Sequence, residues 1–152
     1  MSFISVRFSV LIRTQIGEEV VDKLSQCIST LYQKEETSVV LSVTRPSYLR
    51  LGGSLEHTYV LTISTLPMQL EPTLNRRNAF SIQRSLANLI KVPSDRGFVR
   101  FIPVQEEMFA TGGTTIFGKI TAKTEFERPS PIVESSGRNH VPRPSFFSKL
   151  RQ

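Results

Sequence analysis

The stretch from Ser38 to Leu66 constrains the fold more than any other part of the chain. It holds two runs rich in β-branched and apolar residues, Val39 to Thr44 and Thr58 to Ser64, as is typical of buried strands. The linker between them contains Arg45-Pro46 and Gly52-Gly53, which neither a helix nor a continuous strand tolerates. We therefore expect two strands with a turn at the double glycine.

A strand and an amphipathic helix are expected before this stretch. Phe3 to Leu11 alternates unevenly between apolar and polar residues, which fits a strand with one buried face. The helix that follows has its apolar residues at helical spacing: Val20, Val21, Leu24, Cys27, Ile28 and Leu31. Cys27 lies on this stripe, so we expect a core residue rather than a reactive thiol.

The same order of elements repeats after the second strand. Pro72 suits the first turn of a helix, and the apolar stripe behind it comprises Ala79, Ile82, Leu86, Leu89 and Ile90. Phe98 to Val104 follows as a strand, and Phe109 to Phe117 is expected to form a short edge strand or hairpin. The chain thus divides into two strand-helix-strand units. This predicts an α/β fold, more narrowly α+β, in which two pseudo-symmetric units form a four-stranded sheet with two helices on one face.

Charge and proline content divide the chain at about residue 118. Residues 1–118 carry 12 Lys and Arg against 10 Asp and Glu, whereas residues 119–152 carry 7 against 3. The second part also holds Pro129, Pro131, Pro142 and Pro144 and lacks an apolar period. We expect one domain over 1–118 and a mostly disordered basic tail over 119–152. Such a tail allows salt-sensitive, non-specific binding of polyanions.

Several functional classes are disfavoured by composition. Cys27 is the single cysteine, and His57 and His140 are the only histidines, so neither an intrachain disulfide nor a metal site is expected, and no cofactor is predicted. No segment approaches the roughly 20 apolar residues of a membrane span. The N-terminal run contains Arg7 and lacks a small-residue cleavage site, which favours a first strand over a signal peptide. A cytoplasmic location is expected.

A ferredoxin-like, RNA-binding fold has the same order of elements. The segment from Arg96 to Phe101 partly resembles the signature octapeptide of those proteins. Val99 stands where a small residue is expected, and Arg100 stands where an aromatic residue is expected. The segment also follows the second helix instead of preceding it. We therefore expect no specific nucleic-acid partner.

Four features from Ser2 to about Phe117 together resemble the macrophage migration inhibitory factor and tautomerase superfamily. Leu51-Gly52-Gly53-Ser54 follows a strand and a proline, and Asn75-Arg76 opens the second helix. Ser94-Asp95-Arg96 enters the last long strand, and Ala110 to Ile116 matches a small C-terminal strand in position. The resemblance implies a homotrimer whose sheets surround a central channel, with active sites between neighbouring subunits. It also implies that export from the cell without a leader peptide is possible.

The family removes a proton beside a carbonyl with the amine of an N-terminal proline, whose pKa lies near the working pH. This chain has Ser2 in that place and no proline before Pro46. If Met1 is removed, the amine of Ser2 is a candidate weak base, because an α-amino group titrates near 8. The alternative is that Ser2 is a plain strand start.

The resemblance assigns the other site residues. Lys34 aligns with the lysine that holds the substrate carboxylate, and it is also placed as a helix C-terminal charge. Leu66 aligns with an apolar wall, while Phe98 replaces a tyrosine and Arg100 replaces an asparagine. Lys34 and Arg100 together would suit a small α-keto acid or another small anion. Alternatively, Arg100 faces solvent or pairs with a glutamate.

The family's paired cysteines are replaced by Thr58 and Leu61, so thiol redox chemistry is not expected. Two functions remain open. One is a keto-enol tautomerase of low activity toward phenylpyruvate-like or dopachrome-like substrates. The other is a catalytically silent, cytokine-like or regulatory trimer that acts through protein partners.

Overall fold

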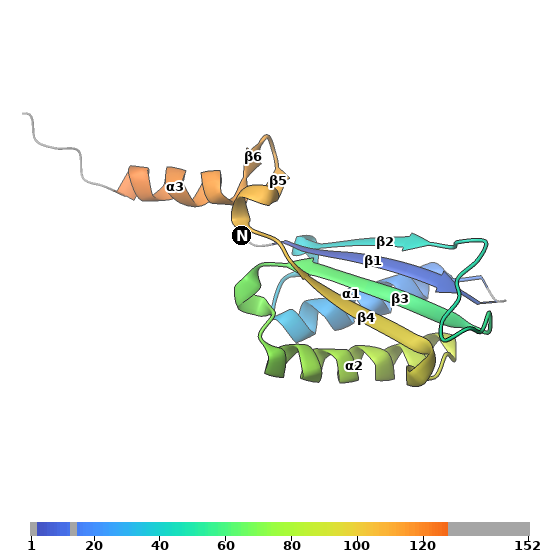
Figure 1. Ribbon diagram of the computed structural model, residues 1–152. Coiled ribbons are helices and arrows are strands. Elements are labelled where there is room, and N and C mark those ends of the chain that lie inside the picture. The colour runs from blue at the N-terminus through green and yellow to red at the C-terminus, as the bar shows by residue number, and fades with distance from the viewer. Residues whose placement is uncertain (1–2, 13–14, 128–152) are drawn as a thin grey trace, which may run out of the picture.

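The computed structural model describes residues 3–12 and 15–127 (Figure 1). Its strands are β1 (Ile4–Leu11), β2 (Val39–Thr44), β3 (Thr58–Thr65), β4 (Gly97–Pro103), β5 (Ala110–Thr111) and β6 (Thr114–Thr115). Its α-helices are α1 (Glu18–Tyr32), α2 (Pro72–Ile90) and α3 (Ile116–Glu127). Short 3₁₀ turns are η1 (Glu36–Ser38), η2 (Pro67–Gln69), η3 (Ser94–Arg96) and η4 (Glu106–Met108). No helix within these residues is long and apolar enough to cross a membrane.

The main sheet has the strand order β2-β1-β3-β4. β1 runs parallel to β2, with Ile4 opposite Val39, and β3 runs parallel to β4. The central pair, β1 and β3, is antiparallel, with Ser5 opposite Ser64. Each strand-helix-strand unit therefore keeps its own two strands adjacent, unlike the split arrangement of ferredoxin-like folds. The predicted four-stranded sheet built from two similar units is confirmed.

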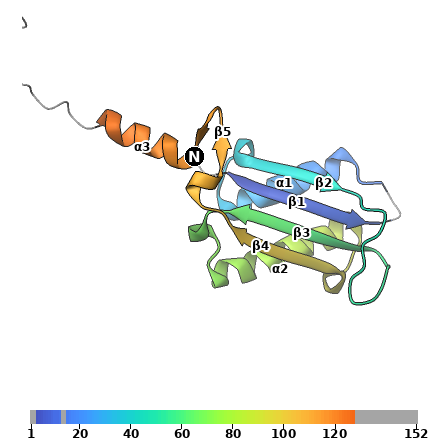
Figure 2. The same cartoon turned by 45° about the horizontal axis from the view of Figure 1, so that its top comes forward.

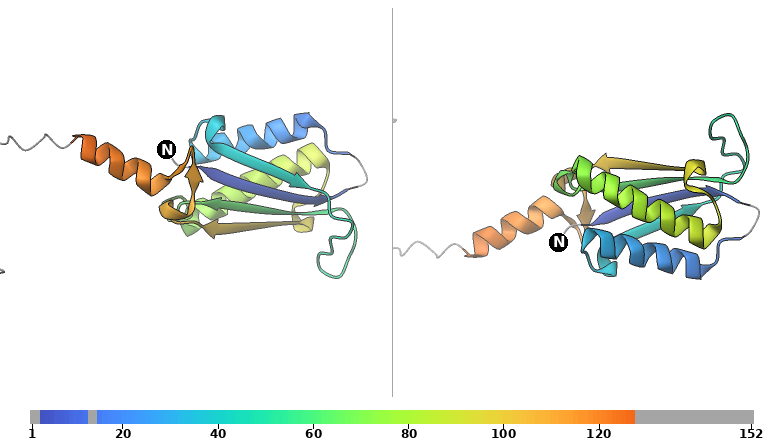
Figure 3. Two further views of the ribbon diagram at one scale, coloured as in Figure 1. Left: turned by 90° about the horizontal axis from the view of Figure 1, so that it is seen from above. Right: turned by 90° about the horizontal axis from the view of Figure 1, so that it is seen from below.

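Helices α1 and α2 both cover one face of this sheet, as predicted (Figure 3). Alternate residues of the two central strands point toward them and are buried: Ile4, Val6, Phe8 and Val10 from β1, and Tyr59, Leu61 and Ile63 from β3. The helices contribute Leu24, Ile28, Ile82 and Leu86 to the same core. Inside it, the rings of Phe8 and Tyr59 pack edge to face with their centroids 5.8 Å apart.

The opposite face of the sheet has no helix over it in the described structure (Figure 2). The register places one residue of each strand in a row across this face: Ser42, Arg7, Thr62 and Arg100. None of β1 to β4 contains an acidic residue. The middle row of the uncovered face therefore consists of two hydroxyl side chains and two cationic side chains.

Glycines form the turns at the two places where the sequence predicts them. Gly52 and Gly53 have φ of 57° and 78°, between the bridged residues Leu51 and Ser54. Gly112 and Gly113 have φ of 62° and 79° and connect β5 to β6. Two consecutive residues at positive φ are the geometry of tight hairpin turns, which explains the glycine pairs.

The C-terminal segment begins with a helix. We expected a mostly disordered tail over residues 119–152, and the structure places residues 119–127 in α3. The helix is supported at its start, where the buried Ile116 donates its N–H to the Phe109 carbonyl and the Thr115 hydroxyl accepts the Gly118 N–H. α3 extends away from the sheet, at the end where the amino terminus lies (Figures 1 and 3). The rest of the predicted tail, residues 128–152, lies outside the described residues.

Candidate functional site

The end of the sheet at which β1 begins and β3 ends brings together the segments named by the sequence. The Thr65 hydroxyl lies 2.7 Å from Gln69 Oε1 and 3.4 Å from the Phe3 carbonyl oxygen. This arrangement fixes the first described residue of the chain beside Leu66 and the 3₁₀ turn η2. Ser2, the predicted base, lies outside the described residues.

Lys34 is held by a tight helix ending. Gln33 adopts a left-handed conformation with φ of 52° and donates its N–H to Thr30, while Lys34 donates its N–H to Ser29. These two bonds form a Schellman motif. The Ser29 hydroxyl also donates to the Lys34 carbonyl at 2.5 Å. The lysine is half-buried, and no ion pair with a described carboxylate engages its ammonium.

Leu66 is buried at the end of β3, where it lines a cavity of about 430 Å³ with Met68, Phe117 and residues 105–107. Leu66 thus contributes apolar surface to this cavity, and its role in substrate binding stays a prediction. Glu106 and Glu107 also line the cavity, and the sequence analysis did not assign them to the site. Two carboxylates disfavour an anion on this side of Leu66, so an anionic group would have to face the cations elsewhere in the site.

A second apolar cavity, of about 270 Å³, opens at the amino end of β1. Phe3, Ser5 and Val40 line it from the uncovered face of the sheet, and residues 109–111 line it from the hairpin segment. The side chains at the start of β1 therefore border a space large enough for a small organic molecule. The alternation in the first strand did not indicate this cavity, because it forms only where the hairpin lies beside the sheet.

Phe98 and Arg100 lie on the uncovered face of β4, and both are exposed in the single chain. Arg100 Nη2 donates to the Thr62 hydroxyl at 3.2 Å, so it does not pair with a glutamate among the described residues. Arg7 lies in the same row, with Thr62 between the two arginines. Arg7 was not predicted from the sequence to lie near Arg100. The sequence did show that both arginines occupy polar-face positions of predicted strands, which could have indicated that they share a face of the sheet.

One chain does not bring all the predicted site residues together. Phe98 pairs in register with Val60 of β3, and Leu66, just after the end of that strand, lies six residues further along the chain. At the rise of a β-strand, this places Phe98 roughly 20 Å from Leu66 along the sheet. Lys34 and Leu66 belong to the amino end of the sheet, whereas Phe98 lies near its far end. A single site containing all of them needs a second copy of the chain.

Cys27 and the two positions at which the family has cysteines offer no redox pair. Cys27 Sγ lies 3.7 Å from Ser85 Oγ in the contact between α1 and α2, which agrees with the predicted core role. Thr58 is buried and donates its hydroxyl to the Arg96 carbonyl at 2.6 Å. No group of metal-ligating side chains occurs within residues 3–12 and 15–127.

Comparisons of sequence and comparisons of fold match this chain to the same group of known proteins. The family model described as macrophage migration inhibitory factor matches residues 1–117. A macrophage migration inhibitory factor homolog of Brugia malayi is 22% identical over 103 residues, which cover 68% of this chain and 89% of that protein.

Two solved structures illustrate the similarity of fold. The macrophage migration inhibitory factor of Trichinella spiralis superposes with a TM-score of 0.67 at 18% identity, covering 73% of this chain and 98% of that one. The homologue from Prochlorococcus marinus also gives a TM-score of 0.67, at 15% identity, covering 74% and 98%. The similarity covers almost the whole length of both solved proteins and about three quarters of this chain, and the family model ends at residue 117.

Proposed function

Because the chain belongs to the macrophage migration inhibitory factor family, we propose that it is a keto-enol tautomerase of low activity toward small α-keto acids of the phenylpyruvate type. The amine of Ser2 acts as the base, and Lys34 and Arg100 hold the substrate carboxylate. The observation that carries the proposal is the position of Phe3. Its carbonyl lies 3.4 Å from the Thr65 hydroxyl, next to Leu66, and its side chain lines the cavity at the start of β1.

The chemistry follows from the protonation state of an amine at this position. An α-amino group titrates near 8, so a fraction of it is neutral and basic at neutral pH. Nearby cations lower the pKa of such an amine and enlarge that fraction. In ketonisation the neutral amine accepts the proton of the enol hydroxyl, and the resulting ammonium delivers it to the carbon beside the new carbonyl, while Lys34 and Arg100 neutralise the carboxylate. A primary amine replaces the proline of the family, so we expect a rate well below that of proline-bearing relatives.

The proposed active unit is a homotrimer with its sites between neighbouring copies. The distance of roughly 20 Å between Phe98 and Leu66 in one chain supports this arrangement, because a copy presenting its uncovered sheet face would add Phe98 and Arg100 to the amino end of the next. The uncovered face carries no acidic residue, which makes it suitable for completing a site that binds an anion. The assembly is tested directly by the molar mass in solution from light scattering.

The activity is tested by following the ketonisation of enol phenylpyruvate by purified protein whose N-terminal mass shows a free Ser2 amine. Ser2→Pro should raise the rate at least about tenfold, since it restores a secondary amine. Acetylation of the Ser2 amine should abolish the rate. No rate in either form, or a rate unchanged by Ser2→Pro, would refute the proposal.

The carboxylate role is tested by Lys34→Ala and Arg100→Ala, each with a matched control. Lys23→Ala removes an exposed lysine that pairs with Glu19 on the same helix, and Arg84→Ala removes an exposed arginine of α2. Each site variant should raise KM about tenfold with little change in kcat, because it removes one charge-assisted contact to the substrate. Both controls should leave KM unchanged.

A catalytically silent trimer that acts by binding protein partners is the second candidate. The observation that favours it is Ser2 at the position of the family's catalytic proline. This function requires a trimeric mass together with the absence of any ketonisation by the chain with a free amine. It also predicts that deleting residues 119–152 preserves the trimer, because the matched family region ends at residue 117. A measurable rate that depends on the Ser2 amine would exclude it.

A further inference from the structure

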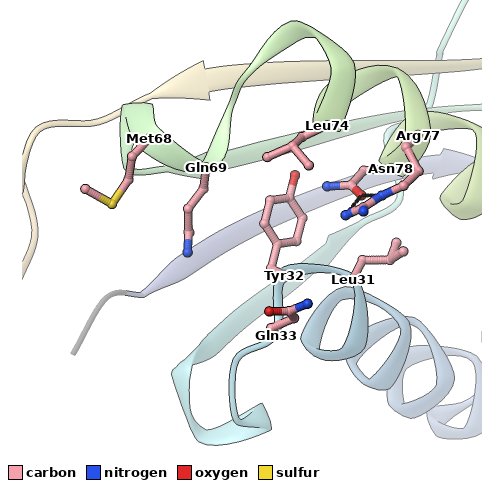
Figure 4. Close-up of a pocket in the computed structure, with 8 residues that line it drawn as sticks. All are labelled: Leu31, Tyr32, Gln33, Met68, Gln69, Leu74, Arg77 and Asn78. Atoms are coloured by element: carbon pink, nitrogen blue, oxygen red, sulfur yellow. Dashed lines mark hydrogen bonds between the residues drawn. The ribbon is translucent and has the colours of Figure 1, made fainter.

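A third cavity lies between the end of α1 and the start of α2 (Figure 4); none of Lys34, Leu66, Phe98 and Arg100 lines it, and it shares Met68 with the cavity beside Leu66. It has a volume of about 250 Å³. Its polar lining consists of the side chains of Tyr32, Gln33, Gln69, Arg77 and Asn78. No carboxylate contributes to the lining. The cavity is therefore bounded by neutral amides, one phenol, one cation and the apolar side chains of Leu31, Met68 and Leu74.

The Tyr32 side chain is the least expected feature of this cavity. Only 7% of the residue is exposed, and its buried hydroxyl makes no hydrogen bond of ordinary geometry in the described structure, with the Asn78 side chain as its nearest polar neighbour. Burial raises the pKa of Tyr32, so the hydroxyl keeps its proton and remains a donor. Figure 4 shows it directed from α1 toward α2. A buried hydroxyl without a partner is costly, and such groups are normally satisfied by a neighbour, a water or a ligand.

Two further groups present donors to the same space. Arg77 Nε and Nη2 both point to Asn78 Oδ1, at 3.4 and 3.3 Å, which are long bonds and leave further N–H groups of the guanidinium unused. Gln69 Oε1 already accepts the Thr65 hydroxyl at 2.7 Å, so the Gln69 amide nitrogen is the end that faces the cavity. Tyr32, Arg77 and Gln69 thus approach from three directions, each with a donor.

We propose that this cavity binds the phosphate group of a small phosphate monoester. Donors from three directions and one guanidinium match the several oxygens and the double charge of phosphate. The first turn of α2 adds the positive end of a helix dipole on the same side. The cavity volume is several times the roughly 30 Å³ that one water molecule takes in the liquid. It therefore leaves room for a small organic part beside a phosphate group.

The test is a titration of the full chain, labelled with ¹⁵N, with inorganic phosphate at constant ionic strength. Amide resonances around residues 31–33, 69 and 74–78 should shift together and saturate. Acetate at equal ionic strength should produce much smaller shifts. Binding of acetate with equal affinity would overturn the assignment to phosphate, and the absence of saturable shifts with phosphate would overturn the site itself.

Adjacent arginines supply a matched pair of variants. Arg77→Gln should weaken phosphate binding at least about tenfold, as expected for loss of a charge-assisted contact. Arg76→Gln makes the same change in net charge at an exposed position that does not line the cavity, so binding should stay within about twofold. Equal losses in both variants would mean general charge attraction and would overturn the site.

Tyr32→Phe separates the hydroxyl from the ring. The variant keeps the buried aromatic packing and removes the unpartnered group, so it should fold at least as well as the parent chain. Phosphate binding should weaken about fivefold, and unchanged binding would exclude the hydroxyl as a ligand. None of these measurements involves the Ser2 amine or the ketonisation rate, so this site and the proposed activity can fail independently.

Discussion

The ring of Tyr59 on β3 fills the space that a side chain at Gly97 on β4 would need. The two residues are partners in the parallel register. A Cβ atom on Gly97 would lie 2.6 Å from Cε1 of the ring and closer still to Cζ and the hydroxyl oxygen. An aromatic ring over a cross-strand glycine is a recognised way to protect that position in a sheet. The packing of Tyr59 therefore requires a glycine at position 97, where β4 begins to pair with β3.

Gly97→Ala should destabilise the protein by about 3 kcal/mol, because Tyr59 is fully buried and its ring cannot move without disturbing the core. Urea unfolding measures the change. Gly17→Ala is the control, since nothing lies within 4 Å of a Cβ at that position, and it should change the free energy of unfolding by less than about 1 kcal/mol. Similar values for the two variants would contradict the packing role of Gly97.

Tyr59 should make stability depend on alkaline pH. Burial raises its pKa from 10.0 to about 12. Between these values the unfolded chain loses the phenolic proton and the folded chain keeps it, so the free energy of unfolding falls as pH rises through this window. The free energy of unfolding keeps its full value below pH 10. About 2 kcal/mol of it is lost by pH 12.

Tyr59→Phe should remove most of that slope. At neutral pH the variant should be about as stable as the parent chain, because the buried Tyr59 hydroxyl makes no hydrogen bond of ordinary geometry and has only the Gln83 side chain near it. Urea midpoints at several alkaline pH values measure both effects. A slope that persists in the variant would assign the alkaline instability to other groups.

Arg96→Lys should loosen the loop that joins the two units. The guanidinium donates to the carbonyls of Leu51, Glu56 and His57, at 2.8, 3.1 and 3.4 Å. A lysine cannot make these fork-shaped contacts, so we expect a loss of about 1 to 2 kcal/mol and faster hydrogen exchange at residues 51–57. Arg84→Lys, at an exposed position of α2, should leave both quantities unchanged. Unaltered exchange in Arg96→Lys would show that the loop holds its own conformation.

Ser29→Ala should disturb the segment that positions Lys34. Its hydroxyl donates to the Lys34 carbonyl, and removing it should cost about 1 kcal/mol and raise exchange at the Lys34 amide. Ser25→Ala, one turn earlier on α1, should be neutral or slightly stabilising because alanine is the better helix former. If both serine variants behave alike, the hydroxyl does not anchor Lys34.

Local patterns in the sequence were sufficient for most of the fold. The β-branched run from Val39 to Thr44 matches β2, and Pro72 to Ile90 matches α2. Paired glycines marked both hairpin-like turns, because consecutive residues at positive φ strongly favour glycine. The first nine residues of the predicted tail form part of a helix that the sequence pattern did not indicate. Their helix depends on the hydrogen bond from Ile116 to Phe109 and on the Thr115 cap, and its apolar period is weak.

The candidate site was predicted only as a set of residues. Lys34 and Leu66 were identified by resemblance, and the structure places both at the end of the sheet where the chain begins. Their distance from Phe98, and the carboxylates of Glu106 and Glu107 beside Leu66, were not apparent from sequence spacing. Both depend on which strands pair and on how the segment after β4 turns back.

The sequence by itself determined the order of strands and helices and the buried face of each, because hydrophobic period and turn residues act over a few neighbours. Only the tertiary structure decided the register that puts Arg7, Thr62 and Arg100 in one row, and the cavity that Tyr32 and Arg77 line together. These features arise from contacts between residues far apart in the chain. Strand pairing and helix packing select such contacts for the core as a whole, and no local pattern encodes them.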